Sequence, residues 1–525
     1  MIGRHIGAVV IEHPSPTEMI VLHLDGQSLR IEDVLAVADG RQHVALAPDA
    51  RRKMQRTRAI VERAVAAGVP VYGVNTGFGK MSEITIPNTQ LTALQRNLVR
   101  SHAAGVGDAL PEREVRAMML LRANVLATGF AGARAVVVDA LLSMLNAGIW
   151  AVIPEQGSVG ASGDLAPLAH LALTLIGEGR ARVGAVEDDA AILLAHAGLS
   201  PLVLEAKEGL ALINGTQAHT AVASLACAEL TRLWYAAHIA TAMSLDALLG
   251  TPDAFDARIQ DARGQPGQKE SAALLRALLH GSAIRESHRQ GDPRVQDAYA
   301  LRCAPQVHGP ALEALRFARD IIGRELNAAT DNPLVLETGE LLSGGNFHGQ
   351  AVGMASDFLA IVCANLAVIS ERRTDRLVHP DFNQGLPPFL AGSPGLESGF
   401  MMAQVTSAAL ASECKTLAHP ASVDSIPTDG NKEDVVPMAM AAATKLRRSV
   451  RNLRHVIAIE LIAAAEGFEH RRPLRSTDVL ERAHALIRTV VRKADGDRAP
   501  GPDITRLAEA LATGAFDHLT DGLVS

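Results

Sequence analysis

Three small residues, Ala161, Ser162 and Gly163, lie between glycines and an acid in the segment Gly157-Ser158-Val159-Gly160-Ala161-Ser162-Gly163-Asp164-Leu165-Ala166-Pro167-Leu168. Glycine reaches backbone conformations that other residues avoid, so this stretch can fold tightly on itself. The amide nitrogen of Gly163 can then approach the carbonyl carbon of Ala161 with almost no side chain in the way. Cyclisation followed by the loss of two waters would leave a conjugated ring. Such a ring is an electrophile of a kind that none of the twenty side chains provides.

A run of small residues is, by itself, more typical of a flexible turn. The longer string GSVGASGDLAPLAH, at residues 157–170, is similar nearly letter for letter to the signature of the histidine and aromatic amino-acid ammonia-lyases. In that family the Ala-Ser-Gly triplet becomes the 4-methylidene-imidazol-5-one (MIO) group. The resemblance therefore implies an MIO formed autocatalytically from residues 161–163, with no external cofactor.

An ammonia-lyase also needs a base and a carboxylate anchor, and the resemblance supplies a candidate for each. Tyr72 opens Tyr72-Gly73-Val74-Asn75-Thr76-Gly77-Phe78-Gly79, which looks like the family's mobile inner loop, where the tyrosine takes the β-proton. A free tyrosine has a pKa near ~10, so the base would need nearby positive charge or an electron-poor ring. Arg302 resembles the carboxylate anchor, and its planar fork suits a carboxylate. Tyr299 and Arg302 would share a helical face, with Gln296 as an amide contact and Tyr299 acting near the ring.

Four further residues match family positions that line the pocket. Asn214 matches the asparagine that holds the MIO oxygen and the substrate carboxylate, although an Asn-Gly pair alone is normally a turn. Phe347 matches an aromatic wall, and its alternative is a core phenylalanine. His102, in a Ser-His pair typical of members acting on histidine, and Glu433, which resembles the acid that meets the imidazole, would read the side chain. A carboxylate facing a ring N–H would discriminate strongly against a phenyl ring.

The chain also departs from the family pattern around this pocket. Val435 replaces a histidine common in histidine lyases, and Val435-Val436 is closer to tyrosine lyases. Gln350, Ala304 and His308 stand where glutamate, glutamine and methionine are usual. The resemblance thus implies elimination of ammonia from an L-amino acid, first L-histidine to give trans-urocanate. A tyrosine- or phenylalanine-type lyase, a 2,3-aminomutase and a non-enzymatic scaffold stay as alternatives.

Composition excludes several other classes of protein. The 525 residues carry a formal net charge of −7 and show no basic tail, which argues against nucleic acid and anionic membranes as partners. Four cysteines stand far apart without a CxxC pair, and no HExxH spacing occurs, so we expect reduced thiols in the cytoplasm and no metal site. The first residues lack the pattern of a signal peptide. A small-molecule amino acid is the expected ligand.

Apolar residues make up 48% of the chain and aromatic residues only 3%, so the core must be built from Ala, Leu, Val and Ile. Helical spacing recurs over 31–67 (broken at Gly40 and Pro48), over 111–147 as two helices, and around 358–369, 401–412 and 436–467, whereas 21–24 reads as a strand. We expect a mainly α protein.

The family resemblance implies a long-helix bundle of the ammonia-lyase (fumarase/aspartase-like) type with a smaller N-terminal α-rich part. We divide the chain into an extension (1–19), an N-terminal part with the inner loop and triplet (20–220) and the bundle with C-terminal helices (221–525). The resemblance also implies a homotetramer with shared active sites.

Overall fold

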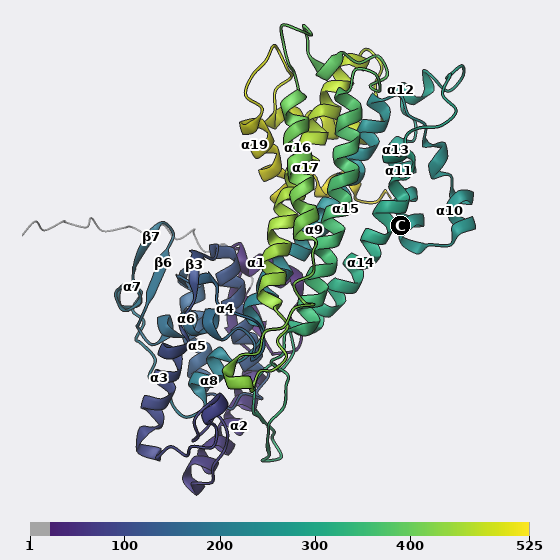
Figure 1. Cartoon of the computed structure of the whole chain (residues 1–525). Helices are drawn as coiled ribbons and strands as arrows, with labels where there is room; N and C mark the ends of the chain where they lie inside the picture. Colours follow the sequence, from purple (N-terminus) through teal and green to yellow (C-terminus); the bar gives the residue numbers. More distant parts are fainter. Residues whose placement is uncertain (1–20, 524–525) are drawn as a thin grey trace, which may run out of the picture.

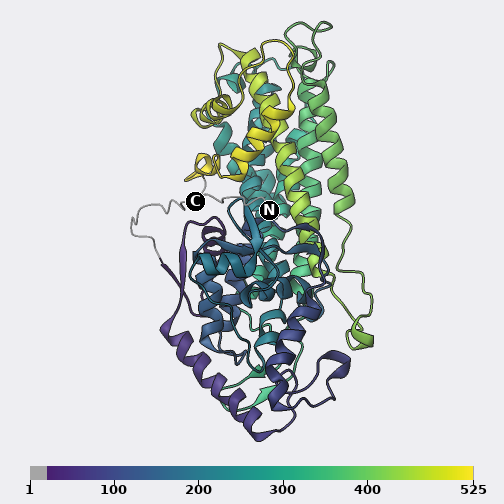
Figure 2. The ribbon, with the colours of Figure 1, turned by 90° about the vertical axis from the view of Figure 1, so that its left-hand side faces the viewer.

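Helices dominate the computed structural model, which describes residues 21–523 (Figures 1 and 2). The mainly α prediction is confirmed, and the predicted extension 1–19 lies outside the described residues. The α-helices of this part of the chain are α1 (Ile31–Ala38), α2 (Pro48–Ala67), α3 (Leu91–His102), α4 (Glu112–Ala127), α5 (Ala135–Asn146), α6 (Leu165–Leu175), α7 (Ala190–His196), α8 (Glu208–Ile213), α9 (Gln217–Ala247), α10 (Ala257–Arg263), α11 (Pro266–Leu279), α12 (Ala283–Glu286), α13 (Tyr299–Arg302), α14 (Ala304–Glu325), α15 (Gln350–Val378), α16 (Met401–Leu417), α17 (Ala439–Arg471), α18 (Asp478–Val490) and α19 (Gly501–Ala512).

The strands are short and form small separate sheets. The parallel pair β1–β2 confirms the strand predicted at 21–24, and β2 fills the interval between α1 and α2 that the helical pattern left open. The strands are β1 (Val21–Leu24), β2 (His43–Leu46), β3 (Val106–Ala109), β4 (Ile149–Ala151), β5 (Pro154–Gln156), β6 (Arg180–Val183), β7 (Val186–Asp189), β8 (Leu334–Val335) and β9 (Leu341–Leu342). The pairs β3–β5, β4–β6, β6–β7 and β8–β9 are antiparallel.

Five long helices, α9 and α14 to α17, run side by side and form the bundle drawn in teal, green and yellow in Figure 1. A buried ion pair joins three of them. Arg373 of α15 donates from Nε to Oε1 of Glu460 on α17 at 2.5 Å, and both side chains are fully buried. Ser244 of α9 and Ser370 of α15 donate to the same carboxylate at 2.7 and 2.6 Å. Because every oxygen of this buried acid is satisfied, it specifies how the helices align.

Two predicted apolar faces are only partly buried within one chain. On α16 the apolar residues at 401, 405 and 409 are exposed in the single chain, and the buried row is Ala403, Ser407, Ala411 and Cys414. Those small side chains let α16 approach α15 and α17 closely. On α15 the predicted face is divided, since Val362, Leu366 and Ile369 are buried whereas Phe358 and Ile361 are exposed.

Helix α15 is long and apolar enough to cross a membrane by length and composition alone. It is the one helix of residues 21–523 that meets this criterion, and 67% of its most apolar 18-residue window is buried inside the protein. That burial is typical of a core helix in a soluble protein, as the sequence pattern around 358–369 predicts.

Two long loops return from the bundle to the N-terminal part. In the loop between α14 and α15, Val335 N donates to Phe130 O at 2.8 Å, and Gly349 N donates to Gly160 O at 3.0 Å. In the loop between α16 and α17, the short 3₁₀ helix at Asp429–Asn431 lies against Gly79–Met81. Segments from three distant parts of the sequence therefore meet beside the triplet.

The bundle core contains a histidine without a hydrogen-bond partner. His308 of α14 is fully buried, and both its ring nitrogens lack partners within residues 21–523. Its ring packs edge-on against that of His238, with centroids 4.6 Å apart. Burial, with the nearby His238 and Arg373, lowers the pKa of His308 well below its ordinary value. His308 is therefore held neutral, at the cost of its lost hydration.

We expect His308→Met to raise the free energy of unfolding by about 1–3 kcal/mol, because a flexible apolar side chain has no polar atoms to leave unpaired. The gain should grow at acid pH. A histidine whose folded pKa is depressed binds more protons when unfolded, so its penalty increases as pH falls below about 6.5. Urea unfolding at pH 8 and pH 5.5 measures both effects, and a variant less stable than the parent at both values contradicts the explanation.

Candidate active site

The triplet Ala161-Ser162-Gly163 forms a tight backbone turn immediately before α6. Gly163 pairs through its backbone with Gly160, with Ala161 and with Gly215 from the start of α9. Its φ is +70°, and a Cβ there would overlap the carbonyl group of Gly215. Only glycine fits this position, and the absent side chain leaves the Gly163 backbone free to lie against Ala161 as cyclisation requires.

Asp164 ties the turn to α9 and to Ser158, a role that the sequence analysis did not assign. Its fully buried carboxylate accepts bonds from Ser158 Oγ at 2.7 Å and His219 N at 2.9 Å, and His219 Nδ1 lies 2.8 Å from it. Burial acts to raise the pKa of Asp164, but the charge and hydrogen bonds of His219, with that of Ser158, outweigh burial and lower it. The acid in the signature string was the available signal.

Ser162 is held at both of its polar groups. Asn214 Nδ2 donates to the Ser162 carbonyl oxygen at 2.8 Å, and the Ser162 hydroxyl donates to Oε1 of Glu433. Thr428 Oγ1 donates to the other Glu433 oxygen at 2.5 Å. The predicted residues Ser162, Asn214 and Glu433 therefore meet, although 271 positions separate the first from the last.

Arg122 positions Asn214 and was not identified from the sequence. Its guanidinium is fully buried on α4 and donates from Nη1 to the carbonyl oxygens of Ala211 and Asn214, at 2.7 and 3.0 Å, and from Nη2 to Gln217. Burial lowers its pKa to about 10. An arginine inside the apolar run of α4 was the only hint, and it could equally have indicated an ion pair.

Two adjoining cavities of about 420 and 520 Å³ open over the triplet. Their walls share Tyr72, Gly79, Ser162, Asp429 and Glu433. The first cavity also contains His102 and Asn214, and the second contains Ala161 and Phe347. The structure thus brings the predicted base of the inner loop and the triplet together with the four predicted pocket residues, His102, Asn214, Phe347 and Glu433.

His102, at the end of α3, lines the first cavity with Ser162 and Glu433. Its Nδ1 lies 2.9 Å from the Leu98 carbonyl oxygen, which can only accept, so Nδ1 is the donor of this bond. The bond fixes the ring at the cavity wall beside the Glu433 carboxylate, which is an acceptor.

Tyr72 lies in the cavity wall, but one chain does not activate it. Burial raises its pKa above the ordinary value, and the carboxylates of Asp429, Glu433 and Asp331 add to the rise, against a hydrogen bond from the Gly79 backbone. A base needs the opposite shift. The sequence analysis required nearby positive charge or an electron-poor ring, and within residues 21–523 no positive charge is among the groups that shift the pKa of Tyr72.

The remaining three predicted residues lie at the other end of the molecule. Tyr299 and Arg302 belong to α13, near the top of Figure 1, whereas α3 and α8 beside the triplet lie at the lower left. The predicted shared face is confirmed, since the Arg302 guanidinium lies 4.6 Å from the Tyr299 ring centroid. Tyr299 is 70% exposed and Gln296 is also exposed. Within one chain, these residues cannot reach the cavity.

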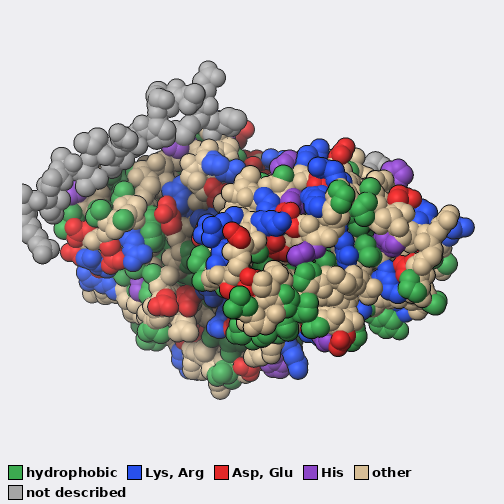
Figure 3. Space-filling view, turned by 90° about the horizontal axis from the view of Figure 1, so that it is seen from above, with side chains coloured by type: hydrophobic (Ala, Val, Ile, Leu, Met, Phe, Trp, Pro, Cys, Tyr) green, Lys and Arg blue, Asp and Glu red, His purple; other side chains and the backbone are tan. Residues whose placement is uncertain are grey.

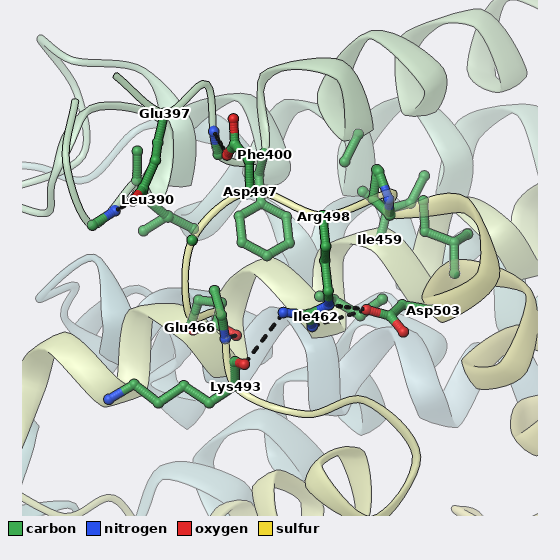
Figure 4. A pocket seen from close by; sticks show the side chains of 18 of the residues that line it. Leu390, Glu397, Phe400, Ile459, Ile462, Glu466, Lys493, Asp497, Arg498 and Asp503 are labelled. Carbon is green, nitrogen blue, oxygen red and sulfur yellow. Dashed lines mark hydrogen bonds and ion pairs between the residues drawn. The ribbon is translucent and has the colours of Figure 1, made fainter. Parts of the chain in front are cut away.

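Another cavity, of about 170 Å³, lies between α16, α17 and α19 (Figure 4). Its floor is apolar, and the charged side chains around it are paired internally. Arg498 Nε donates to Asp503 at 2.9 Å, and Asp497 accepts two backbone bonds at 2.8 Å. None of the predicted site residues lines it.

Comparison with known proteins agrees with this geometry. The family described as "Aromatic amino acid lyase" matches residues 29–489. The chain belongs to the aromatic amino acid lyase family. It is 53% identical over 508 residues to a histidine ammonia-lyase of Anaeromyxobacter dehalogenans, covering 95% of this chain and 100% of that one. The crystal structure of histidine ammonia-lyase from Trypanosoma cruzi matches with a TM-score of 0.90 and 41% identity over 96% of both chains. A tyrosine aminomutase from Streptomyces globisporus matches with a TM-score of 0.90 and 37% identity, over 95% of this chain and 98% of that one.

Members of this lyase family depend on MIO, and the residues of this chain fit that group. The backbone of Gly163 pairs with that of Ala161, as ring closure requires, and the Asn214 amide is already directed at the Ser162 carbonyl oxygen. Asn214 Oδ1 is buried without a hydrogen-bond partner within residues 21–523. It is therefore available to a donor that enters the cavity.

Proposed function

We propose that this lyase forms MIO from Ala161-Ser162-Gly163 and converts L-histidine to trans-urocanate and ammonia in the cytoplasm. The observation that carries the proposal is the convergence of Ser162, Asn214, His102 and Glu433 on one cavity. The identity of 53% to a histidine ammonia-lyase supports the choice of substrate.

Each task in the proposed reaction falls to a different group. MIO supplies the electrophile that makes the substrate amine a leaving group. Tyr72, in the wall above the triplet, takes the β-proton, and Asn214 holds the substrate and the triplet carbonyl. Arg302 of a second copy of the chain anchors the substrate carboxylate through its planar fork. Its positive charge would also lower the pKa of Tyr72, which burial and, to a lesser extent, nearby carboxylates raise in a single chain.

His102 and Glu433 favour an imidazole over a phenyl ring. Both line the cavity, and the Glu433 carboxylate is an acceptor that an imidazole N–H can satisfy. A phenyl ring would leave this acceptor without a partner, which is how polar sites reject apolar analogues by about 10⁴–10⁵-fold.

We infer a homotetramer in which each active site combines residues of different copies. An exposed apolar stripe runs along α15 at helical spacing through Met354, Phe358, Ile361 and Val368, at 39–48% exposure, and it continues to Phe317 of α14, whose ring packs edge-on against Phe358. Such a stripe is typical of an interface, and a second copy is the occupant that would also carry α13 to the cavity. On the face shown in Figure 3, basic and acidic side chains are interspersed, which does not favour nucleic acid as a partner.

A substrate panel tests the proposed reaction. We expect rapid formation of urocanate from L-histidine, measured by ultraviolet absorbance, and turnover of L-tyrosine and L-phenylalanine at least about 10³-fold slower. Val435, exposed at the cavity wall, and the aminomutase neighbour favour a tyrosine 2,3-aminomutase as the second candidate. Coumarate or β-tyrosine without urocanate would support that candidate and contradict histidine as the substrate.

A further inference from the structure

Glu433 contacts the oxygen atom that must depart if the triplet loses water. Its Oε1 accepts the hydrogen bond of the Ser162 hydroxyl, and its Oε2 is held by Thr428 at 2.5 Å. Within residues 21–523, no other side chain hydrogen-bonds this hydroxyl. The carboxyl is therefore placed to exchange a proton with the leaving oxygen.

The other polar group of Ser162 is held in a way that favours the same elimination. Asn214 Nδ2 donates to the Ser162 carbonyl oxygen at 2.8 Å, and Arg122 holds the Asn214 backbone. A donor at this oxygen stabilises the negative charge that develops when the adjacent Cα loses its proton. One side chain thus serves the carbonyl and another serves the hydroxyl of the same residue.

We propose that Glu433 is the general acid that expels the Ser162 hydroxyl during maturation, before it binds any substrate. Glu433 first takes a proton from a water molecule of the cavity, and its carboxyl then donates to Ser162 Oγ. The hydroxide left behind takes the Cα proton of Ser162 and becomes water again, and the electron pair of the Cα–H bond forms the Cα=Cβ bond. The Cβ–Oγ bond breaks, and the departing oxygen takes the Glu433 carboxyl proton and leaves as water. Glu433 is left as a carboxylate, and nothing is oxidised or reduced. This inference rests on the proposed function, which requires the dehydrated triplet.

The step also prepares Glu433 for its second task. When the hydroxyl oxygen leaves, Oε1 loses its hydrogen-bond donor, whereas Thr428 still holds Oε2. A carboxylate with one free oxygen then faces the cavity in which the substrate ring would lie. The same side chain acts first on the protein and afterwards on the substrate.

Intact-mass measurement of Glu433→Gln tests the proposal without relying on activity. Glutamine keeps the size of the side chain but has no acidic proton. The control is Asp434→Asn, which removes the same charge from the exposed neighbouring residue. We expect the parent and the control to be lighter than the encoded chain by two waters. Glu433→Gln should retain the second water, with dehydration after synthesis slowed by about 100-fold or more. Glu433→Asp, which keeps an acidic proton, should dehydrate faster than Glu433→Gln.

Three outcomes would overturn part of this account, and they can be told apart. Loss of both waters by Glu433→Gln at the parent's rate contradicts the proposal, even if histidine turnover falls. Equal, slow dehydration of the Asp and Gln variants also contradicts it, provided that circular dichroism shows both variants folded. A parent protein of full, unshortened mass contradicts the proposed function itself.

Discussion

Ser162→Ala is expected to abolish ammonia release from histidine, lowering kcat/KM by on the order of 10⁴-fold or more, because alanine cannot lose water and no electrophile can form. The variant should fold normally. The Ser162 side chain makes a single hydrogen bond, to Glu433, and Asn214 contacts the backbone carbonyl that alanine retains. Steady-state urocanate formation measures the loss, and intact mass should show that the variant loses no more than the one water of cyclisation.

Ser82→Ala is the matched control for this variant. Ser82 lines the same cavity, and the substitution removes an identical hydroxyl. Its side chain is not hydrogen-bonded to the triplet, so activity should stay within about 3-fold of the parent. Full activity of Ser162→Ala, or an equal loss in both variants, would contradict an electrophile formed at residue 162.

Co-expression of Tyr72→Phe with Arg302→Ala is expected to restore activity that neither variant has alone. Tyr72 lies over the triplet and Arg302 lies on α13, at the far end of the same chain. A site assembled from two copies is intact when one chain supplies Tyr72 and another supplies Arg302. Random assembly of equal amounts gives about one intact site in four. Each variant alone should lose on the order of 10²-fold or more in kcat/KM, through the base or the anchor.

The control for complementation places both changes in one chain. Tyr72→Phe/Arg302→Ala co-expressed with the Tyr72→Phe variant contains no intact Tyr72, so no activity should return. Size-exclusion chromatography with light scattering establishes that mixed assemblies have the mass of the parent. Inactive mixed assemblies would show that Arg302 does not complete the site of another copy.

Some features followed from the sequence because they depend on local chemistry. The string around Ala161-Ser162-Gly163 indicated the reaction class through its resemblance to the ammonia-lyases, and its glycine at 163 is required by the backbone. Helical periodicity predicted the α4–α5 pair and α17, where apolar residues are frequent enough to mark the element. It did not identify the row of α16 that packs within the chain, because close packing there selects small residues rather than the most apolar ones.

The tertiary structure decided which side chains lie close together, which a single sequence does not reveal. The contacts of Arg122 with Asn214 and of Asp164 with His219 join segments far apart in the chain, and each residue looks ordinary until its neighbours are known. The same holds for the distance that keeps Arg302 from Tyr72 in one chain. Residue type determined the chemistry available to this protein, whereas packing of the long helices determined which groups can act together, because reach depends on three-dimensional separation.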